Sequence, residues 1–145
     1  METTQKQSNQ LLQIGVILFT LALLTGFGMP LYTNPRLGLS SHLAGVMNGI
    51  FLLIMGIIWP KIKLSAKQQK ITYFLLIFST FANWFANLLG AIWGAGESVV
   101  PLAADGEGTM NQELILKALF GSLSVGFVVA CFLIIKGLRS NLKNE

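Results

Sequence analysis

Four long blocks of apolar residues limit what this chain can fold into more than any other feature of its sequence. They cover approximately residues 11–32, 42–60, 71–96 and 114–136. A helix needs about 20 apolar residues to cross the roughly 30 Å hydrocarbon core of a bilayer. Because lipid offers no partner for unpaired backbone groups, blocks of this length are expected to be helical. The sequence therefore predicts an all-α, polytopic membrane protein, with one domain over residues 1–145 formed by a bundle of four transmembrane helices.

The composition agrees with lipid as the main solvent of the chain. Hydrophobic residues make up 53% of the sequence and charged residues 11%, whereas soluble domains carry about 25% charged residues. The formal net charge of +4 does not indicate a nucleic-acid partner, because the basic residues flank the apolar blocks. The first block is expected to be a span and not a cleaved signal peptide, since it is too long and no Ala-x-Ala site follows it.

The charges of the connections predict the orientation. The connection between the second and third blocks carries four lysines and no acid, and the C-terminal tail is also basic. The connection over residues 97–112 carries three acids and no base. By the positive-inside rule, both termini and the lysine-rich connection are expected in the cytoplasm. The acidic connection is expected to be an exposed cap on the opposite side.

Polar residues in the second block suggest a site. Winding this block at 100° per residue puts His42, Gly45 and Gly49 on one face, with Asn48 alongside. Glycines allow a flat molecule or another helix to approach the backbone closely. Two simpler readings stay open: Gly45-x-x-x-Gly49 can serve helix packing, and His42 can be an interfacial residue.

The third block carries two asparagines, Asn83 and Asn87, one turn apart on the same face. They can form the wall of a polar pocket, or they can make interhelical hydrogen bonds worth about 0.6 to 2 kcal/mol each. In the fourth block, Glu113 and Lys117 are four residues apart and can pair. At 1.5 Å per residue, polar residues of three blocks are expected at matching depths and can meet in the outer half of the bilayer, namely His42, Asn48, Asn87 and Ser124.

The chemistry open to these residues is restricted. No carboxylate lies within a span, which disfavours proton-coupled transport. A zinc site needs three or four ligands, which the spans of one chain cannot supply with a single histidine. One histidine suffices to bind a haem iron from one side and leave the other axial position open. An open ferric position is a Lewis acid.

Two stretches carry a resemblance to a known family. The run Asn-Pro-Arg-Leu-Gly-Leu-Ser-Ser-His from Asn34 to His42, continued to Gly49, resembles the hydroxylaminobenzene mutases. The stretch from Asn83 to Gly94 does so as well, and the similarity covers nearly the whole chain. The core is also similar, more distantly, to styrene oxide isomerase, in which the same histidine is followed by Asn-Gly six and seven places later, here Asn48 and Gly49.

The resemblance implies an activity and a cofactor. Hydroxylaminobenzene mutases convert arylhydroxylamines into aminophenols, and styrene oxide isomerase binds ferric haem b through the matching histidine at subunit contacts of a trimer. By position, His42 would ligate the iron, and Asn48 and Asn87 would be catalytic residues that hold a small aromatic substrate. The residues beside the haem would be Gly45, Gly49 and Arg36, and the substrate pocket would include Asn83, Trp84 and Trp93. A homotrimer in the bacterial inner membrane is expected.

Other functions remain open at this point. Styrene oxide isomerase has a tyrosine shortly after the second asparagine, where this chain has Ala91, and this departure favours the mutase over an epoxide isomerase. A mutase without haem is a further alternative. A noncatalytic membrane helper or transporter that oligomerises through its glycine faces would be colourless and show no turnover.

Overall fold

The computed structural model describes residues 2–103, 106 and 108–142. In this part of the chain there are four α-helices, two short 3₁₀ turns and no strand, so the all-α prediction is confirmed. The elements are α1 (Glu2–Phe27), η1 (Met29–Leu31), α2 (Pro35–Ile58), η2 (Trp59–Lys61), α3 (Ala66–Trp93) and α4 (Met110–Leu142). All four α-helices are long and apolar enough to span a membrane.

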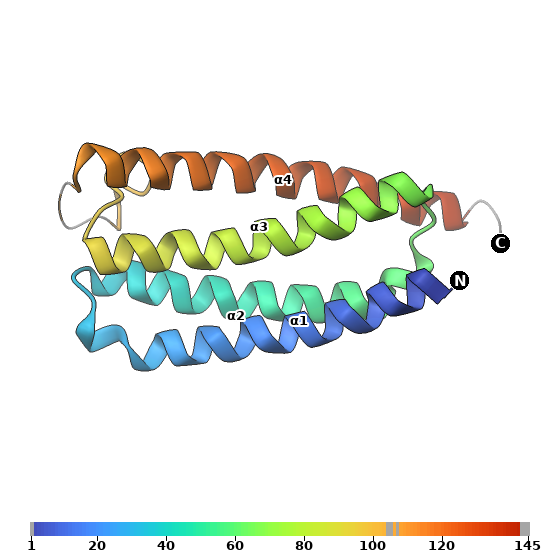
Figure 1. Ribbon diagram of the computed structural model, residues 1–145, viewed down its shortest axis with the longest axis horizontal. Coiled ribbons are helices and arrows are strands. Elements are labelled where there is room, and N and C mark those ends of the chain that lie inside the picture. Colours follow the sequence, from blue (N-terminus) through green and yellow to red (C-terminus); the bar gives the residue numbers. More distant parts are fainter. Residues whose placement is uncertain (1, 104–105, 107, 143–145) are drawn as a thin grey trace.

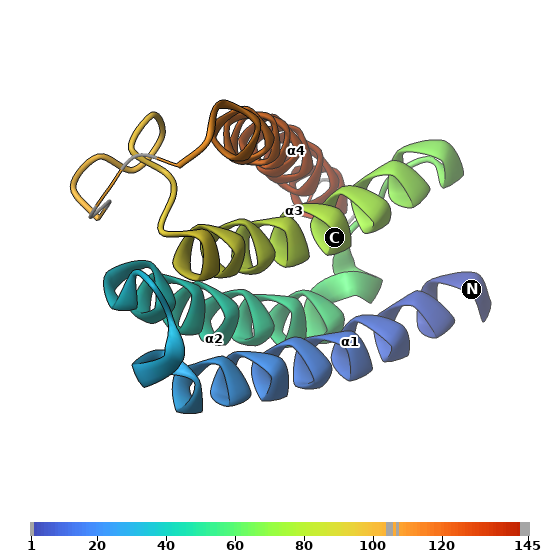
Figure 2. The ribbon, with the colours of Figure 1, turned by 60° about the vertical axis from the view of Figure 1, so that its left-hand side comes forward.

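The helices lie side by side in chain order (Figure 1). α1 packs on α2, α2 on α3, and α3 on α4, whereas α4 makes no helix-to-helix contact with α1 in the described residues. The predicted bundle is therefore open and has the form of a bent row (Figure 2). The start of α1 and the end of α4 lie at the same end of the helix axes as η2 (Figure 1). This end carries the lysine-rich connection.

All four helices begin before the predicted spans. α1 begins at Glu2 because its polar first turns are also helical and packed: the Ser8 hydroxyl donates to the Gly56 carbonyl at 2.7 Å. α1 ends at Phe27, before the predicted residue 32, and the chain turns through η1, which contains Pro30. Proline lacks the N–H that a continuing helix would use.

α2 begins seven residues before His42, where a cap is written into the sequence. The side chain of Asn34 accepts a hydrogen bond from the Leu37 N–H at 3.1 Å, and Pro35 takes the first helical position. Asparagine as cap and proline directly after it are both favoured at helix starts. His42 therefore lies two turns inside α2 and not at its outer end, as the predicted span had it.

Glycines bring α1 and α2 into backbone contact. A Cβ built on Gly15 would lie 2.9 Å from the carbonyl oxygen of Gly49, and one on Gly49 would lie 2.8 Å from the backbone nitrogen of Phe19. Small residues permit such close packing of membrane helices, where van der Waals contact replaces the hydrophobic effect. The α1–α2 pair is the tight part of the row.

The outward faces of the helices are apolar and exposed. On α4, the exposed side chains include Val125, Val128 and Phe132, and on α2 they include Met47 and Ile57. An apolar surface of this extent is not found on soluble monomers. The chain is a multi-pass membrane protein by the length and composition of its helices.

Candidate functional site

His42 is anchored to the neighbouring helix by one ring nitrogen. Its Nδ1 atom lies 2.7 Å from the carbonyl oxygen of Ala22 on α1, and its side chain is half-buried. Because a carbonyl oxygen can only accept a hydrogen bond, Nδ1 must carry the proton. In the neutral ring the lone pair then lies on Nε2, for which the described residues offer no hydrogen-bond partner.

Gly26 makes room for this imidazole. A Cβ on Gly26 would lie 2.8 Å from Nδ1 and 3.1 Å from Cε1 of His42. Ala22 and Gly26 are one turn apart on α1, so together they form a small-residue seat for the ring. The ring is thereby fixed in orientation by a hydrogen bond on one side and by close contact with the helix on the other.

Hydrogen bonds also join α3 to α1 and to α2 near His42. The Trp84 indole N–H donates to the Thr25 hydroxyl at 3.0 Å, and Thr25 in turn donates to the Leu21 carbonyl. The Ser41 hydroxyl donates to the Trp84 carbonyl at 2.9 Å. We call Ala22, Thr25, Gly26, Ser41, His42 and Trp84 the His42 cluster. It joins three helices, and it brings together two of the residues predicted for the site, His42 and Trp84.

Tyr32 closes the cluster toward the loop end. Its hydroxyl donates to the backbone carbonyl of Thr25 at 3.0 Å. Its ring occupies the space that a Cβ on Gly28 or Gly38 would need. The aromatic ring thus fills the corner between the end of α1 and the start of α2.

Asn48 lies on another side of α2. It is buried, and its amide N–H₂ donates to the Thr80 carbonyl of α3 at 3.1 Å. His42 faces α1 whereas Asn48 faces α3, so the two side chains do not meet within one chain. Since the N–H₂ group is engaged, the amide oxygen is the atom with which Asn48 can accept a hydrogen bond from a ligand.

Asn87 has the same character one helix away. It is buried, and its N–H₂ group donates to the Asn83 carbonyl at 2.8 Å. It lies between Trp84, whose carbonyl binds Ser41, and Ala91, whose carbonyl binds the Asn34 N–H, and so lies about one helical turn from the level of His42. Trp93 is the last residue of α3 and packs half-buried in a separate apolar cluster with Leu116.

The predicted glycine groove is filled by protein. A Cβ on Gly45 would lie 2.6 Å from the Ala22 Cβ and 2.7 Å from Cδ1 of Trp84, and Gly49 faces the α1 backbone. Helix packing, the simpler reading that the sequence left open, is what both glycines do within this chain. Their predicted place beside a porphyrin finds no space on these faces. Arg36 is exposed in the first turn of α2, and its predicted haem contact stays a prediction.

The predicted Glu113–Lys117 pair is wrong, because Glu113 instead holds the acidic connection. Its carboxylate accepts from the backbone N–H groups of Gly96 at 2.6 Å and Gly108 at 3.3 Å, and from Ser98. These backbone N–H groups satisfy the Glu113 carboxylate, which does not need Lys117 as a partner. The connection is thus tied to the start of α4 and is not only an exposed cap.

Ser124 lies apart from His42. It is exposed on α4, and its hydroxyl donates to the Phe120 carbonyl of the same helix.

Trp84 borders an apolar hollow of about 370 Å³ between α3 and α4, lined also by Phe81, Phe85 and Leu119. Its size and aromatic walls suit a small aromatic molecule.

The described residues contain no group of three or more His, Cys, Asp or Glu side chains that could hold a metal ion. One imidazole with a fixed tautomer and an available Nε2 is instead what a haem iron requires from a protein on one side.

Comparisons with known proteins identify the class. A family model described as Styrene oxide isomerase matches residues 7–139. The hydroxylaminobenzene mutase HabB of Ectopseudomonas oleovorans is 47% identical over 134 residues, which is 92% of this chain and 82% of the relative. HabA of the same organism, also a hydroxylaminobenzene mutase, is 38% identical over 127 residues, 86% of this chain and 94% of the relative. No solved structure gives a match.

These matches show that the chain is an isomerase, and its four helices are long and apolar enough to span a membrane. The suggested resemblance is confirmed. The chain belongs to the styrene oxide isomerase family.

The main residues that the sequence reasoning missed are on α1. The sequence analysis placed no site residue in the first block, yet α1 supplies the carbonyl of Ala22 and the gap at Gly26. A signal for this was present, because Ala22 and Gly26 form a small-x-x-x-small pattern typical of close helix contacts. The pairing with His42 could not be read from the pattern alone.

Proposed function

We propose that this isomerase rearranges arylhydroxylamines into aminophenols by intramolecular transfer of the hydroxyl group, with ferric haem b bound by His42. The observation that carries the proposal is the hydrogen bond of His42 Nδ1 to Ala22, which leaves Nε2 as the ligand atom. Support for the reaction comes from the mutases HabB and HabA, which share 47% and 38% identity with this chain.

The surroundings of His42 fit a ligand of haem iron, whereas Gly45 and Gly49 pack against protein. A metal-binding histidine commonly donates its second ring N–H to a backbone carbonyl, which fixes the tautomer and raises the basicity of the ligand nitrogen. His42 has this arrangement, and Gly26 keeps the ring in place. When bound, the haem iron would supply a Lewis acid that would weaken the N–O bond of the substrate.

The chain itself would bind and orient the substrate. Asn48 and Asn87 have engaged their N–H₂ groups, so their amide oxygens would accept hydrogen bonds from the hydroxylamine N–H and O–H. Aromatic side chains such as Trp84 would hold the ring, and Asn83 and Trp93 would complete the pocket. In the net rearrangement the N–O bond breaks, the oxygen bonds to the ortho carbon, and the hydrogen lost from that carbon is balanced by one gained at nitrogen. Holding the oxygen beside the ortho carbon, away from water, can contribute about 7 to 11 kcal/mol to lowering the barrier.

The direction of these side chains supports an assembly of subunits. Because His42 faces α1 and Asn48 faces α3, a site that uses both would be completed across a subunit contact. α1 and α2, which hold His42 between them, carry exposed apolar side chains, among them Leu23, Phe27 and Leu43. A neighbouring copy can cover these side chains. We propose a homotrimer in the bacterial inner membrane, with both termini in the cytoplasm as the lysine-rich end indicates.

An isotope experiment tests the proposed reaction. The purified protein, prepared with ample haem supply, is incubated with phenylhydroxylamine labelled with ¹⁸O in its hydroxyl group, and the product is analysed by mass spectrometry. We expect 2-aminophenol that keeps the label, because reactant and product are isomers and the oxygen does not exchange. Product that carries oxygen from the solvent, or no turnover, would contradict an intramolecular transfer.

Epoxide isomerisation is the second candidate, and the family match over residues 7–139 favours it. It is tested in the same preparation with styrene oxide, whose isomer is an aldehyde. We expect turnover of the hydroxylamine to exceed that of the epoxide. The reverse order would replace the mutase proposal with this second one.

A further inference from the structure

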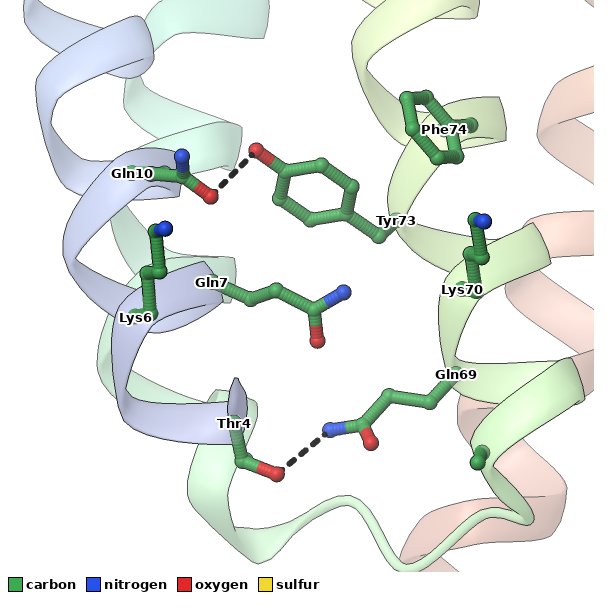
Figure 3. A pocket seen from close by; sticks show the side chains of 9 residues that line it. Thr4, Lys6, Gln7, Gln10, Gln69, Lys70, Tyr73 and Phe74 are labelled. Carbon is green, nitrogen blue, oxygen red and sulfur yellow. Dashed lines mark hydrogen bonds between the residues drawn. The ribbon is translucent and has the colours of Figure 1, made fainter. Parts of the chain in front are cut away.

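A polar hollow lies far from the His42 cluster, at the lysine-rich end of the helix axes. α1 and α3 flank it, and its volume is about 790 Å³ (Figure 3). The size is in the range of sites that bind small molecules. No residue of the proposed reaction lines it.

Two hydrogen bonds between the flanking helices hold the hollow in shape. The Tyr73 hydroxyl donates to the Gln10 side-chain oxygen at 3.1 Å, and the Gln69 amide donates to the Thr4 hydroxyl at 3.1 Å. Figure 3 shows both bonds crossing from α1 to α3. The hollow is therefore bounded on two sides by bonded pairs and does not depend on a ligand for its form.

Gln7 presents a donor to the hollow. Its side-chain oxygen accepts the indole N–H of Trp59 at 3.2 Å. Because an indole nitrogen can only donate, the oxygen of Gln7 must face Trp59, and the N–H₂ group is left for a ligand. In Figure 3 the Gln7 side chain reaches into the space between α1 and α3.

The charge of the hollow is positive. Lys6 stands on α1 and Lys70 on α3, on opposite sides of the space. None of the described residues that line it is acidic. Two ammonium groups and an amide donor around one space are suited to an anion that carries several acceptor oxygens, such as a phosphate group.

The apolar part of the hollow indicates where the phosphate comes from. Tyr73 and Phe74 lie about one turn deeper along α3 than Lys70, and the Phe74 ring is 57% exposed. A dissolved phosphate gains nothing from these rings. A phospholipid places its headgroup at the end of membrane-spanning helices and its acyl chains one turn deeper, beside the exposed ring.

We propose that this hollow binds an anionic phospholipid, with the headgroup phosphate between Lys6 and Lys70, the Gln7 amide as donor and the acyl chains along Phe74. The site lies outside the proposed reaction and does not depend on it. The bound lipid links α1 to α3 at the lysine-rich end, where side-chain hydrogen bonds join the two helices.

Native mass spectrometry of the full chain tests this site. Detergent-purified protein is titrated with phosphatidylglycerol and, separately, with phosphatidylcholine of the same acyl chains. The variant Lys6→Gln/Lys70→Gln removes both charges of the hollow. The matched control Lys61→Gln/Lys67→Gln removes two exposed lysines of the same end that do not line it.

We expect preferential binding of phosphatidylglycerol that falls about 30-fold in Lys6→Gln/Lys70→Gln and stays unchanged in the control. Equal weakening in both variants would mean that only the general charge of this end attracts the lipid, and would overturn the site. Equal binding of the two lipids would overturn it as well. Displacement of the lipid by millimolar glycerol 3-phosphate would show a site for free phosphate and overturn the choice of a lipid.

A single-residue variant keeps the test independent of the lysines. Gln7→Glu retains an oxygen for Trp59 but adds a negative charge to the hollow, whereas Gln5→Glu adds the same charge at an exposed position of α1. We expect Gln7→Glu to lose phosphatidylglycerol and Gln5→Glu to retain it, with equal unfolding temperatures. Retention of the lipid by Gln7→Glu would contradict the proposal.

Discussion

The Nδ1 atom of His42 lies 2.7 Å from the carbonyl oxygen of Ala22, so the single histidine of this chain is held by a backbone atom of the neighbouring helix. A backbone acceptor cannot be lost by a side-chain change at position 22. It fixes the tautomer as long as α1 and α2 stay in register, and the glycine contacts of these helices keep that register. The tight α1–α2 packing and the direction of the imidazole are therefore one structural feature.

The seat of the ring can be tested at Gly26. In Gly26→Ala the new methyl group would lie 2.8 Å from His42 Nδ1 and push the ring off the Ala22 carbonyl. We expect haem affinity to fall about 10- to 100-fold, as for other losses of an outer partner of a ligating histidine. The measurement is haem per chain after purification and titration.

Gly121→Ala is the matched control for this change. A Cβ at Gly121 meets no atom within 4 Å, so the same substitution on α4 should leave haem content and unfolding temperature unaltered. Wild-type haem content in Gly26→Ala would show that the ring does not depend on its seat.

Asn34 is expected to be important for stability. It is fully buried, it caps α2 through Leu37, and its amide donates to the Ala103 carbonyl at 2.7 Å. Asn34→Ala should lower the free energy of unfolding by about 1 to 3 kcal/mol, because it removes a cap and leaves the carbonyl of the half-buried Ala103 without its donor. Thermal unfolding in detergent measures this.

Asn34→Asp separates the two roles. It keeps an oxygen for the cap but has no amide to donate to Ala103. We expect an unfolding temperature between those of wild type and Asn34→Ala. Equal stability of all three proteins would contradict the account of this residue.

Glu113 should control the connection between α3 and α4. Glu113→Ala removes the acceptor for the N–H groups of Gly96, Ser98 and Gly108, so the connection should open and be cut faster by a protease. Glu97→Ala removes an exposed carboxylate of the same connection and serves as control. Limited proteolysis of both variants beside wild type measures the effect, and equal rates in the two variants would refute it.

The contact of α3 with α4 contains a buried hydroxyl with no partner among the described residues, that of Ser79, directly against Gly126. Ser79→Ala should be neutral or stabilising, since no hydrogen bond is lost. Gly126→Ala should destabilise by about 1 to 3 kcal/mol through overpacking, and less in the Ser79→Ala background. Thermal unfolding of the four proteins gives the coupling, and a large loss from Ser79→Ala alone would show a bond not seen here.

The number and kind of helices could be predicted from the apolar blocks, because lipid demands helices of a given length. Their bounds could not, since the polar first turns of α1 are also helical and bind α2 and α3 through Ser8 and Gln10. The start of α2 could have been predicted from Asn34 and Pro35, which are a helix cap and a first-turn proline.

The histidine was found from the sequence because it is the only one, but its partner was not. A bond between an imidazole and a backbone carbonyl on another helix depends on how α1 and α2 pair, which no local pattern contains. Gly45 and Gly49 mark a close contact correctly, but glycines do not reveal whether a helix or a ligand lies against them.

Replacement of the His42 imidazole tests the central claim most directly. The absorption spectrum and the aminophenol yield are measured for wild type and for His42→Gly, each with and without added imidazole. Nε2 ligation predicts a strong haem band in wild type, loss of band and turnover in His42→Gly, and recovery of both when free imidazole enters the vacated seat. A His42→Gly protein that keeps its full haem band and full turnover without imidazole would contradict the account.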